Sequence, residues 1–198
     1  MTENMADDRW LLKQDLDREC LDVERRRLMS GVEDGEKIMG IWVDSFYVSC
    51  NGEAPKVLQR AKELMLIVNE KGISGPWPND EAWPEVLPRW FVDACAPEKT
   101  VEEMWREQEE RRAMAWEQQR EIARTKKWSL LTWVSWMDPR GRYWLWWDAE
   151  VRDDRTLLAH VDKVGDPPAG EPPGFRWLFQ ASGAKDLDEV KDPANIVR

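Results

Sequence analysis

Apolar residues recur every three or four positions through most of the first 126 residues, which is the spacing of one face of an α-helix. We predict helices over residues 7–29, 54–71, 80–96 and 100–126. The prolines within 80–96 allow one short helix or two. Residues 100–126 should form the longest helix and an exposed one, because the stretch 108–112 holds no apolar side chain.

Residues 36–50 are apolar and fit two kinds of element. Ile38, Trp42 and Phe46 are spaced by four, which suits a helix, whereas the β-branched and aromatic content suits a buried strand. We favour a helix, because no turn signal interrupts the run. In either case the segment should belong to the core.

Charged and capping residues mark the ends of two predicted helices. Thr100 and Glu103 fit a capping box, in which each side chain accepts a hydrogen bond from a free backbone N–H group at the helix start. The charged run from Glu24 to Arg27 ends the first helix. There it should be solvated and complement the negative end of the helix dipole.

From residue 128 onward the apolar period changes to two, which is typical of β-strands. Residues 138–141 read Asp-Pro-Arg-Gly, which is favourable β-turn chemistry, and the Pro/Gly-rich segment 165–174 is expected to be a loop. Four strands follow from this pattern, at residues 128–137, 143–151, 156–164 and 175–181.

These elements together predict an α+β fold. About five helices in residues 7–126 would pack on a four-stranded antiparallel β-meander in residues 128–182, and residues 184–198 would form a polar tail. We expect a single domain over residues 1–198, because the helices carry apolar faces that need covering and the meander offers one of similar extent.

Strict alternation sorts the side chains of the predicted sheet onto two faces. The core face should hold the more apolar set: Tyr143, Leu145, Trp147, Ala149, Val151, Leu157, Ala159, Val161, Phe175, Trp177 and Phe179. The opposite face mixes aromatic and charged side chains: Trp144, Trp146, Asp148, Glu150, Leu158, His160, Asp162, Arg176, Leu178 and Gln180.

Two interpretations of this second face are open. In the first, helices cover the face and its tryptophans belong to the core. In the second, Trp144, Trp146 and Trp136 form an exposed aromatic patch rimmed by acidic residues, and a patch of that kind is typical of an interface.

The chain contains 14 tryptophans in 198 residues and carries a formal net charge of −10. Affinity for nucleic-acid phosphates and for anionic lipid comes from clustered Lys and Arg, so the acidity argues against nucleic-acid and membrane partners. It would instead steer a basic protein toward this chain.

Apolar runs, the first residues and the cysteines all bear on location. No apolar stretch approaches the roughly 18 residues that a membrane-spanning helix needs. The first residues are acidic and polar, unlike a secretory signal. Cys20, Cys50 and Cys95 are odd in number and widely spaced, so we expect a cytoplasmic protein without a disulfide framework.

The sequence lacks the usual motifs for metal, nucleotide and cofactor binding. It has a single His, no CxxC, HxH or HExxH pattern, and no GxGxxG or P-loop motif, so we expect no metal and no cofactor. A nucleophilic site would have to use His160, which has Asp162 two residues away on the same strand face. That spacing is equally common in purely structural pairs.

Paired carboxylates offer an enzymatic alternative. Asp148 and Glu150 share the second face with Trp144 and Trp146, and sugar-cleaving sites combine stacking indoles with two carboxylates. Here the carboxylates are neighbours on one strand and do not face each other across a cleft. We therefore rank non-catalytic binding of carbohydrate or another small ligand by the same tryptophans above a small hydrolase that uses Asp148 and Glu150.

We favour a non-catalytic, acidic protein-binding module. An acidic, tryptophan-rich chain suits the binding of a basic partner, as inhibitors or immunity-type proteins bind a nuclease or another basic toxin. The sequence predicts neither the identity of the partner nor the oligomeric state. The expected partner-binding residues are Trp136, Trp144, Trp146, Asp148, Glu150, His160 and Asp162.

Overall fold

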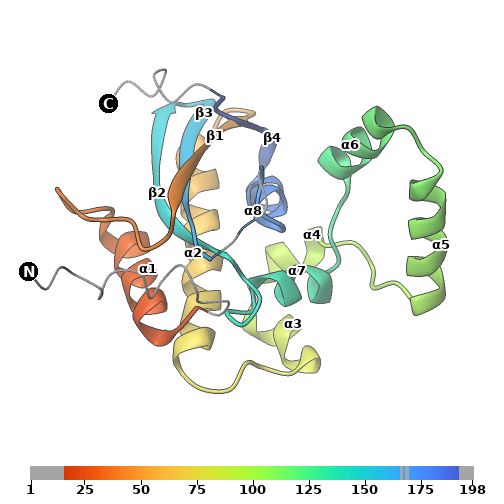
Figure 1. The fold of residues 1–198 in the computed structure, drawn as a ribbon, viewed down its shortest axis with the longest axis horizontal. Helices are drawn as coiled ribbons and strands as arrows, with labels where there is room; N and C mark the ends of the chain where they lie inside the picture. The colour runs from red at the N-terminus through yellow and green to blue at the C-terminus, as the bar shows by residue number, and fades with distance from the viewer. Residues whose placement is uncertain (1–15, 166, 168–169, 192–198) are drawn as a thin grey trace, which may run out of the picture.

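A computed structural model describes residues 16–165, 167 and 170–191. The fold is α+β, as the sequence predicts, with a four-stranded antiparallel sheet and helices packed around it (Figure 1). The strands are β1 (Trp42–Cys50), β2 (Trp144–Asp153), β3 (Thr156–Lys163) and β4 (Ala184–Glu189). The helices are α1 (Arg18–Ser30), α2 (Ala54–Ile73), the short 3-10 helix η2 (Asp80–Ala82), α3 (Trp83–Val86), α4 (Arg89–Ala94), α5 (Val101–Arg112), α6 (Trp116–Thr125), α7 (Leu130–Met137) and α8 (Phe175–Ser182).

The sheet has the strand order β2-β3-β1-β4, and each neighbouring pair is antiparallel. The strands predicted over 143–151 and 156–164 are confirmed as β2 and β3, which form a hairpin. The connectivity of the predicted meander is wrong, because β1 enters from the N-terminal half of the chain and lies between β3 and β4.

Residues 42–50 form a central strand, so the helix predicted over 36–50 is wrong. Phe46, Val48 and Cys50 are buried, and the residues between them are exposed. This period of two is the true signal, and the helical spacing of the largest side chains obscured it. Part of the segment is also outside the core, since four of its large side chains are more than a third exposed, namely Ile38, Ile41, Trp42 and Tyr47.

The segment predicted as a strand over 128–137 contains helix α7 instead. Leu130, Trp133, Val134 and Met137 are its buried residues. They follow the i, i+3, i+4, i+7 spacing of one helix face, so the alternation seen in the sequence was coincidental.

The strand predicted over 175–181 is also a helix, α8. Phe175, Leu178 and Phe179 are buried at helical spacing, and Trp177 is buried beside them. Glycines with positive φ precede and follow the helix, and their left-handed backbone ends the helical conformation on both sides.

Residues 184–189 form edge strand β4, whereas the sequence predicted a polar tail over 184–198. Leu187 is buried opposite Val48 of β1, while most of its neighbours in β4 are polar and exposed. One apolar residue in a charged stretch is too weak a signal for a strand. Residues 192–198 lie outside the described part of the chain.

The helices predicted over 54–71 and 80–96 are confirmed as α2 and as the series η2, α3 and α4. Helix α1 begins after Asp17, whose side chain accepts a hydrogen bond from the backbone N–H of Cys20 at 3.0 Å. The predicted range 7–29 extends into residues outside the described part. Within the part of the chain that is described, no helix combines the length and the apolar character needed to cross a membrane.

The predicted helix over 100–126 is divided into α5 and α6. The capping box at its start is confirmed: Thr100 Oγ1 accepts from the N–H of Glu103 at 3.2 Å, and Glu103 accepts from the N–H of Thr100 at 2.8 Å. After a turn, the N–H of Ala115 donates to the Gln118 side chain at 3.2 Å and α6 begins. Helix α2, with 20 residues, is longer than either part.

The main hydrophobic core lies between the sheet and the helices α2, α7 and α8. Its largest fully buried side chains are aromatic and include Trp83, Trp133, Trp144, Trp146 and Phe175. A smaller cluster is formed where α1 meets β2, by Leu16, Cys20, Leu21, Leu145 and Val164. Both sides of the β2 end of the sheet are thus covered by helices.

Replacing Trp133 by alanine should destabilise the protein by about 3–5 kcal/mol. Trp133 is fully buried, its ring centroid lies 4.6 Å from that of Phe91, and its Nε1 donates to the carbonyl of Gly174 at 3.0 Å. Chemical unfolding with urea measures the change. The matched control is Trp105→Ala, which removes a 58% exposed ring and should change stability by less than about 0.5 kcal/mol. A loss below about 1 kcal/mol in the Trp133 variant would contradict this packing.

Candidate functional site

Strand β2 does not alternate strictly, because its pairing with β3 shifts register between Trp146 and Asp148. A β-bulge of this kind adds one residue and moves the side chains that follow it to the other face. Trp144 and Trp146 therefore lie in the main core together with Ala149, while Leu145 belongs to the cluster under α1. Side chains that were predicted to share one face of β2 therefore lie on opposite sides of the sheet.

Trp144 and Trp146 are covered, with 1% and 0% of their surfaces exposed. The Trp144 ring meets Phe175 edge-on at 5.2 Å, and the Trp146 ring stacks on Phe179 at 6.1 Å. Both phenylalanines belong to α8, the helix that the sequence predicted as a further strand. The exposed sheet patch is therefore wrong, and the other interpretation, in which these tryptophans belong to the core, is confirmed.

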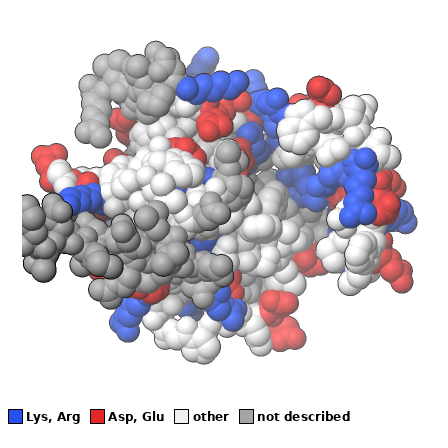
Figure 2. All heavy atoms as spheres, in the orientation of Figure 1, with Lys and Arg blue, Asp and Glu red and all other residues white. Residues whose placement is uncertain are grey.

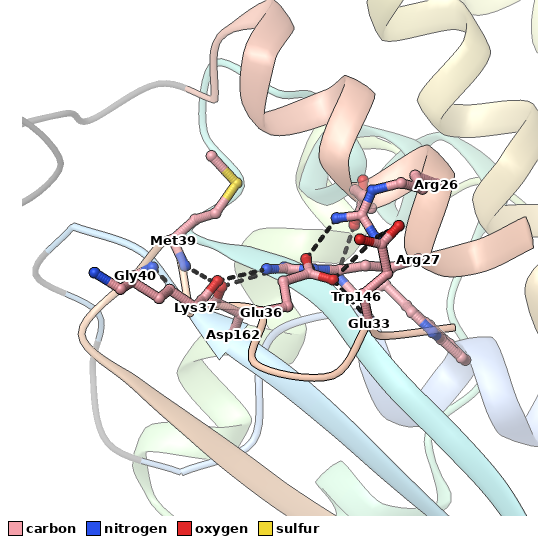
Figure 3. Close-up of polar contacts among 10 residues, drawn as sticks. Arg26, Arg27, Glu33, Glu36, Lys37, Met39, Gly40, Trp146 and Asp162 are labelled. Carbon is pink, nitrogen blue, oxygen red and sulfur yellow. Dashed lines mark hydrogen bonds and ion pairs between the residues drawn. The ribbon is translucent and has the colours of Figure 1, made fainter. Parts of the chain in front are cut away.

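Asp162 is fully buried and holds the loop before β1 against α1 (Figure 3). Its carboxylate accepts from the backbone N–H groups of Met39 and Gly40 at 2.7 and 2.9 Å and from Arg27 at 3.3 Å. Arg27 also donates to Glu36 at 2.7 Å. Burial raises the pKa of Asp162, and the hydrogen bonds and Arg27 oppose that effect. Asp162 is a structural anchor and offers no surface to a partner.

Two members of the charged run that ends α1, Glu24 and Arg27, are fully buried, so the prediction of a solvated helix end is wrong for both. Glu24 accepts two hydrogen bonds from Arg142, at 3.0 and 2.6 Å. It also accepts from the backbone N–H of Trp146 at 2.7 Å and from Asn69 at 3.0 Å. These contacts fasten α1 to the β2 edge of the sheet and to α2.

His160 lies in a polar row that crosses three strands. Its Nδ1 is 2.8 Å from the hydroxyl oxygen of Ser45 on β1, and Asp148 is its cross-strand neighbour on β2. Ser45 is only 7% exposed in the middle of a paired strand. The Asp148 carboxylate accepts from the N–H of Ala149 at 2.8 Å. This row stabilises the sheet and gives a substrate little access to the serine.

The remaining predicted residues, Glu150 and Trp136, are exposed but lie on different elements. Glu150 pairs with Arg152 on the same strand at 2.6 Å. Trp136 is 41% exposed on α7. The structure does not bring these two residues into one site, and only Trp136 borders a groove.

Helices α5 and α6 and the turn between them, residues 101–125, form a projection that we call the arm (Figure 1). Within α5 and α6 no residue is buried. Polar helices that bury no face are held by their caps and by i,i+4 ion pairs. The arm nevertheless exposes four large apolar side chains, Val101 (62%), Met104 (48%), Trp105 (58%) and Trp116 (68%).

A groove of about 690 Å³ separates the arm from α7 and from the segment 96–99. Trp128, Leu131 and Trp136 contribute apolar surface on the α7 side, and Met104 contributes it on the α5 side. Lys and Arg atoms gather where the arm faces the body (Figure 2). The groove therefore combines an apolar wall with positive charge.

Glu107 of α5 lies among three cations in this groove. It pairs closely with Lys99, with Arg111 at 2.6 Å and with Lys126 at 2.9 Å. Hydrogen bonds from Lys99 and Lys126 lower the pKa of Glu107 to about 2. One carboxylate thus joins α5 to the residues just before and just after the arm.

The last turn of α6 is fastened to the body by further polar contacts. Arg124 pairs closely with Asp186 of β4 and lies 3.1 Å from Asp188. The Gln180 side chain of α8 donates to the carbonyl of Arg124 at 2.8 Å. The arm is therefore positioned by hydrogen bonds and ion pairs, and its apolar side chains are left available.

Sequence reasoning placed Trp136 in the contact surface and missed Trp105 and Trp116. The signal that could have identified them is their setting, because each lies in a helix that otherwise consists largely of charged and polar residues. A tryptophan in such a helix has no core to join unless another chain supplies it.

A scan against protein-family models and searches of curated proteins and of solved structures find no match to this chain. Within the described residues, no group of three or more His, Cys, Asp or Glu side chains is arranged to hold a metal ion.

Replacing Glu24 by glutamine should cost about 3–5 kcal/mol of stability, because the fully buried Arg142 would lose its counter-charge. Urea unfolding measures the loss. The double variant Glu24→Gln/Arg142→Met removes both charges and should recover part of it. A single variant as stable as the wild type would contradict the role given to this ion pair.

Acidification should weaken the attachment of the arm through Glu107. The pKa of this group is about 2 in the folded chain, against an ordinary value of 4.5. Its ion pairs therefore stabilise the fold above about pH 4.5, and this stabilisation is lost as the pH falls toward 2.

Between about pH 6 and pH 2.5, the wild type should lose about 0.5–1 kcal/mol more than Glu107→Gln, as urea unfolding would measure. Glu110→Gln, an exposed position on the same helix, is the control and should behave as the wild type. Equal losses in the wild type and Glu107→Gln would argue against the proposed attachment.

Proposed function

We propose that this chain is a non-catalytic protein-binding module whose contact surface is the arm. The observation that carries the proposal is the exposure of Trp105 and Trp116, by 58% and 68%, on two helices that bury no residue. Tryptophan is enriched among the residues that contribute most to binding at protein interfaces. Covering about 100 Å² of indole contributes about 2.5 kcal/mol at about 25 cal/mol per Å².

The arm is suited to a protein partner rather than to a small ligand. Val101, Trp105 and Trp116 project from the arm and are more than half exposed, and Met104 lines one wall of the open groove. Trp144 and Trp146, the tryptophans that the sequence offers for carbohydrate binding, are in the core. Flat, rigid aromatic side chains with charged neighbours are typical of the centre and rim of a protein interface.

We further propose that the partner is basic over its surface as a whole, as an immunity-type inhibitor would require. The net charge of −10 supports this, because a negative field accelerates the approach of a positively charged protein. In this view the acidic body steers the partner and the apolar arm retains it.

Alanine at both Trp105 and Trp116 should weaken binding of the partner by about 30-fold, which corresponds to about 2 kcal/mol. The partner is first recovered by affinity capture from cells that express the chain naturally, then purified and titrated against each variant by calorimetry. Trp42→Ala is the matched control, since this ring is also exposed but lies on β1. It should bind within about twofold of the wild type.

Two results would contradict these proposals. Wild-type affinity in the Trp105→Ala/Trp116→Ala variant, with its helical content preserved, would exclude the arm as the contact surface. An affinity that does not fall between about 0.05 M and about 0.5 M salt would exclude a basic partner, because screening weakens attraction between opposite charges.

A further inference from the structure

The groove between the arm and α7 differs in charge from the molecule as a whole. Six charged side chains line it, four cations and two carboxylates, namely Lys99, Arg111, Lys126, Lys127, Glu98 and Glu107. The chain has a net charge of −10, yet this concave surface has an excess of two positive charges. A positively charged groove on an acidic protein favours a partner that carries negative charge where it contacts the groove.

Both carboxylates of the groove are already engaged within the chain. Glu98 accepts from the backbone N–H of Leu131 at 2.8 Å, and Glu107 is surrounded by Lys99, Arg111 and Lys126. A lysine has three N–H donors and an arginine has five, so a single carboxylate cannot satisfy them all. The groove therefore retains hydrogen-bonding capacity for a further anionic group.

Apolar surface lies beside these cations. Trp128, Leu131 and Trp136 line the groove from one side and Met104 lines it from the other, and Trp136 is 41% exposed. The volume of about 690 Å³ is within the range of roughly 300–1,000 Å³ that is typical of ligand sites. The groove is large enough to hold several side chains and is much larger than a single ion.

We propose that this groove binds an acidic, apolar peptide segment of the protein partner. A carboxylate of the segment pairs with Lys127 and its cationic neighbours, and an adjacent aliphatic or aromatic side chain packs on Trp136. This proposal rests on the proposed function and adds to it a specificity element. A basic partner that lacks such a segment would meet like charge at the groove, and this rejects wrong partners.

The test uses the full chain and a fluorescein-labelled synthetic peptide in which Asp or Glu alternates with Leu or Phe. Fluorescence anisotropy compares it with a peptide carrying Asn and Gln in place of the acids, and with one carrying Lys. The acidic peptide should bind at least about tenfold more tightly than the neutral one, which corresponds to about 1.4 kcal/mol for one charge-assisted contact. The lysine peptide should bind most weakly.

Two variants locate the binding. Lys127→Glu reverses one charge of the groove and should weaken binding of the acidic peptide at least tenfold (~1.4 kcal/mol). Trp136→Ala removes the apolar contact and should weaken the acidic and neutral peptides alike. Lys185→Glu, at an exposed position of β4, makes the same charge change elsewhere and should leave binding unchanged. Circular dichroism verifies that each variant is folded.

The proposal is overturned if the acidic and neutral peptides bind equally, or if Lys127→Glu binds the acidic peptide as the wild type does. Full competition by inorganic phosphate alone would reassign the groove to a simple anion. A dimer in sedimentation velocity that Lys127→Glu abolishes would reassign it to a second copy of the chain. If the partner no longer binds Trp105→Ala/Trp116→Ala but still binds Lys127→Glu as tightly as the wild type, this inference is overturned. The proposed function is then still supported.

Discussion

The carboxylate of Glu24 lies between α1, α2 and the edge of the sheet, where it accepts hydrogen bonds from Arg142, Asn69 and the backbone of Trp146. A buried charge is stable only when it is paired and fully hydrogen-bonded, so this contact fixes where β2 runs relative to α1. The bulge that follows Trp146 brings Ala149 to the same side of the sheet as Trp144 and Trp146. The two indoles pack against α8 in the core, whereas Trp42 and Tyr47 of β1 stay partly exposed. The more exposed indoles of Trp105 and Trp116 lie on the arm.

Much of the helical region could be predicted from the sequence because its signals are local. Helix α2 has a buried stripe with a regular spacing, and Thr100 and Glu103 cap α5 with their own side chains. The identities of β1, β4, α7 and α8 could not be read in the same way. Short apolar runs such as 130–137 satisfy both periods, and the choice between helix and strand is made by the neighbours that they pack against. Leu187 illustrates this, because only its pairing with β1 shows that it belongs to a strand.

The candidate site was less predictable than the fold. Its residues come from segments 96–99, 104–111 and 123–136, and nothing in the local pattern shows that these segments enclose a groove. The predicted sheet face failed because residues 175–181, expected to be a strand, form helix α8, which covers Trp144 and Trp146. Trp136 is exposed, as one of the two interpretations of the sheet predicts, but it lies on a helix and not on a strand.

Strand β4 ends the sheet at an open edge, and its sequence determines how that edge behaves. Lys185, Asp188 and Glu189 are exposed along it, and Asp186 is engaged by Arg124 and Arg176. Charged side chains on an edge strand oppose the addition of another strand, because incoming backbone would have to displace ions and water. The β4 edge is thereby protected against the edge-to-edge pairing through which sheets grow into fibrils.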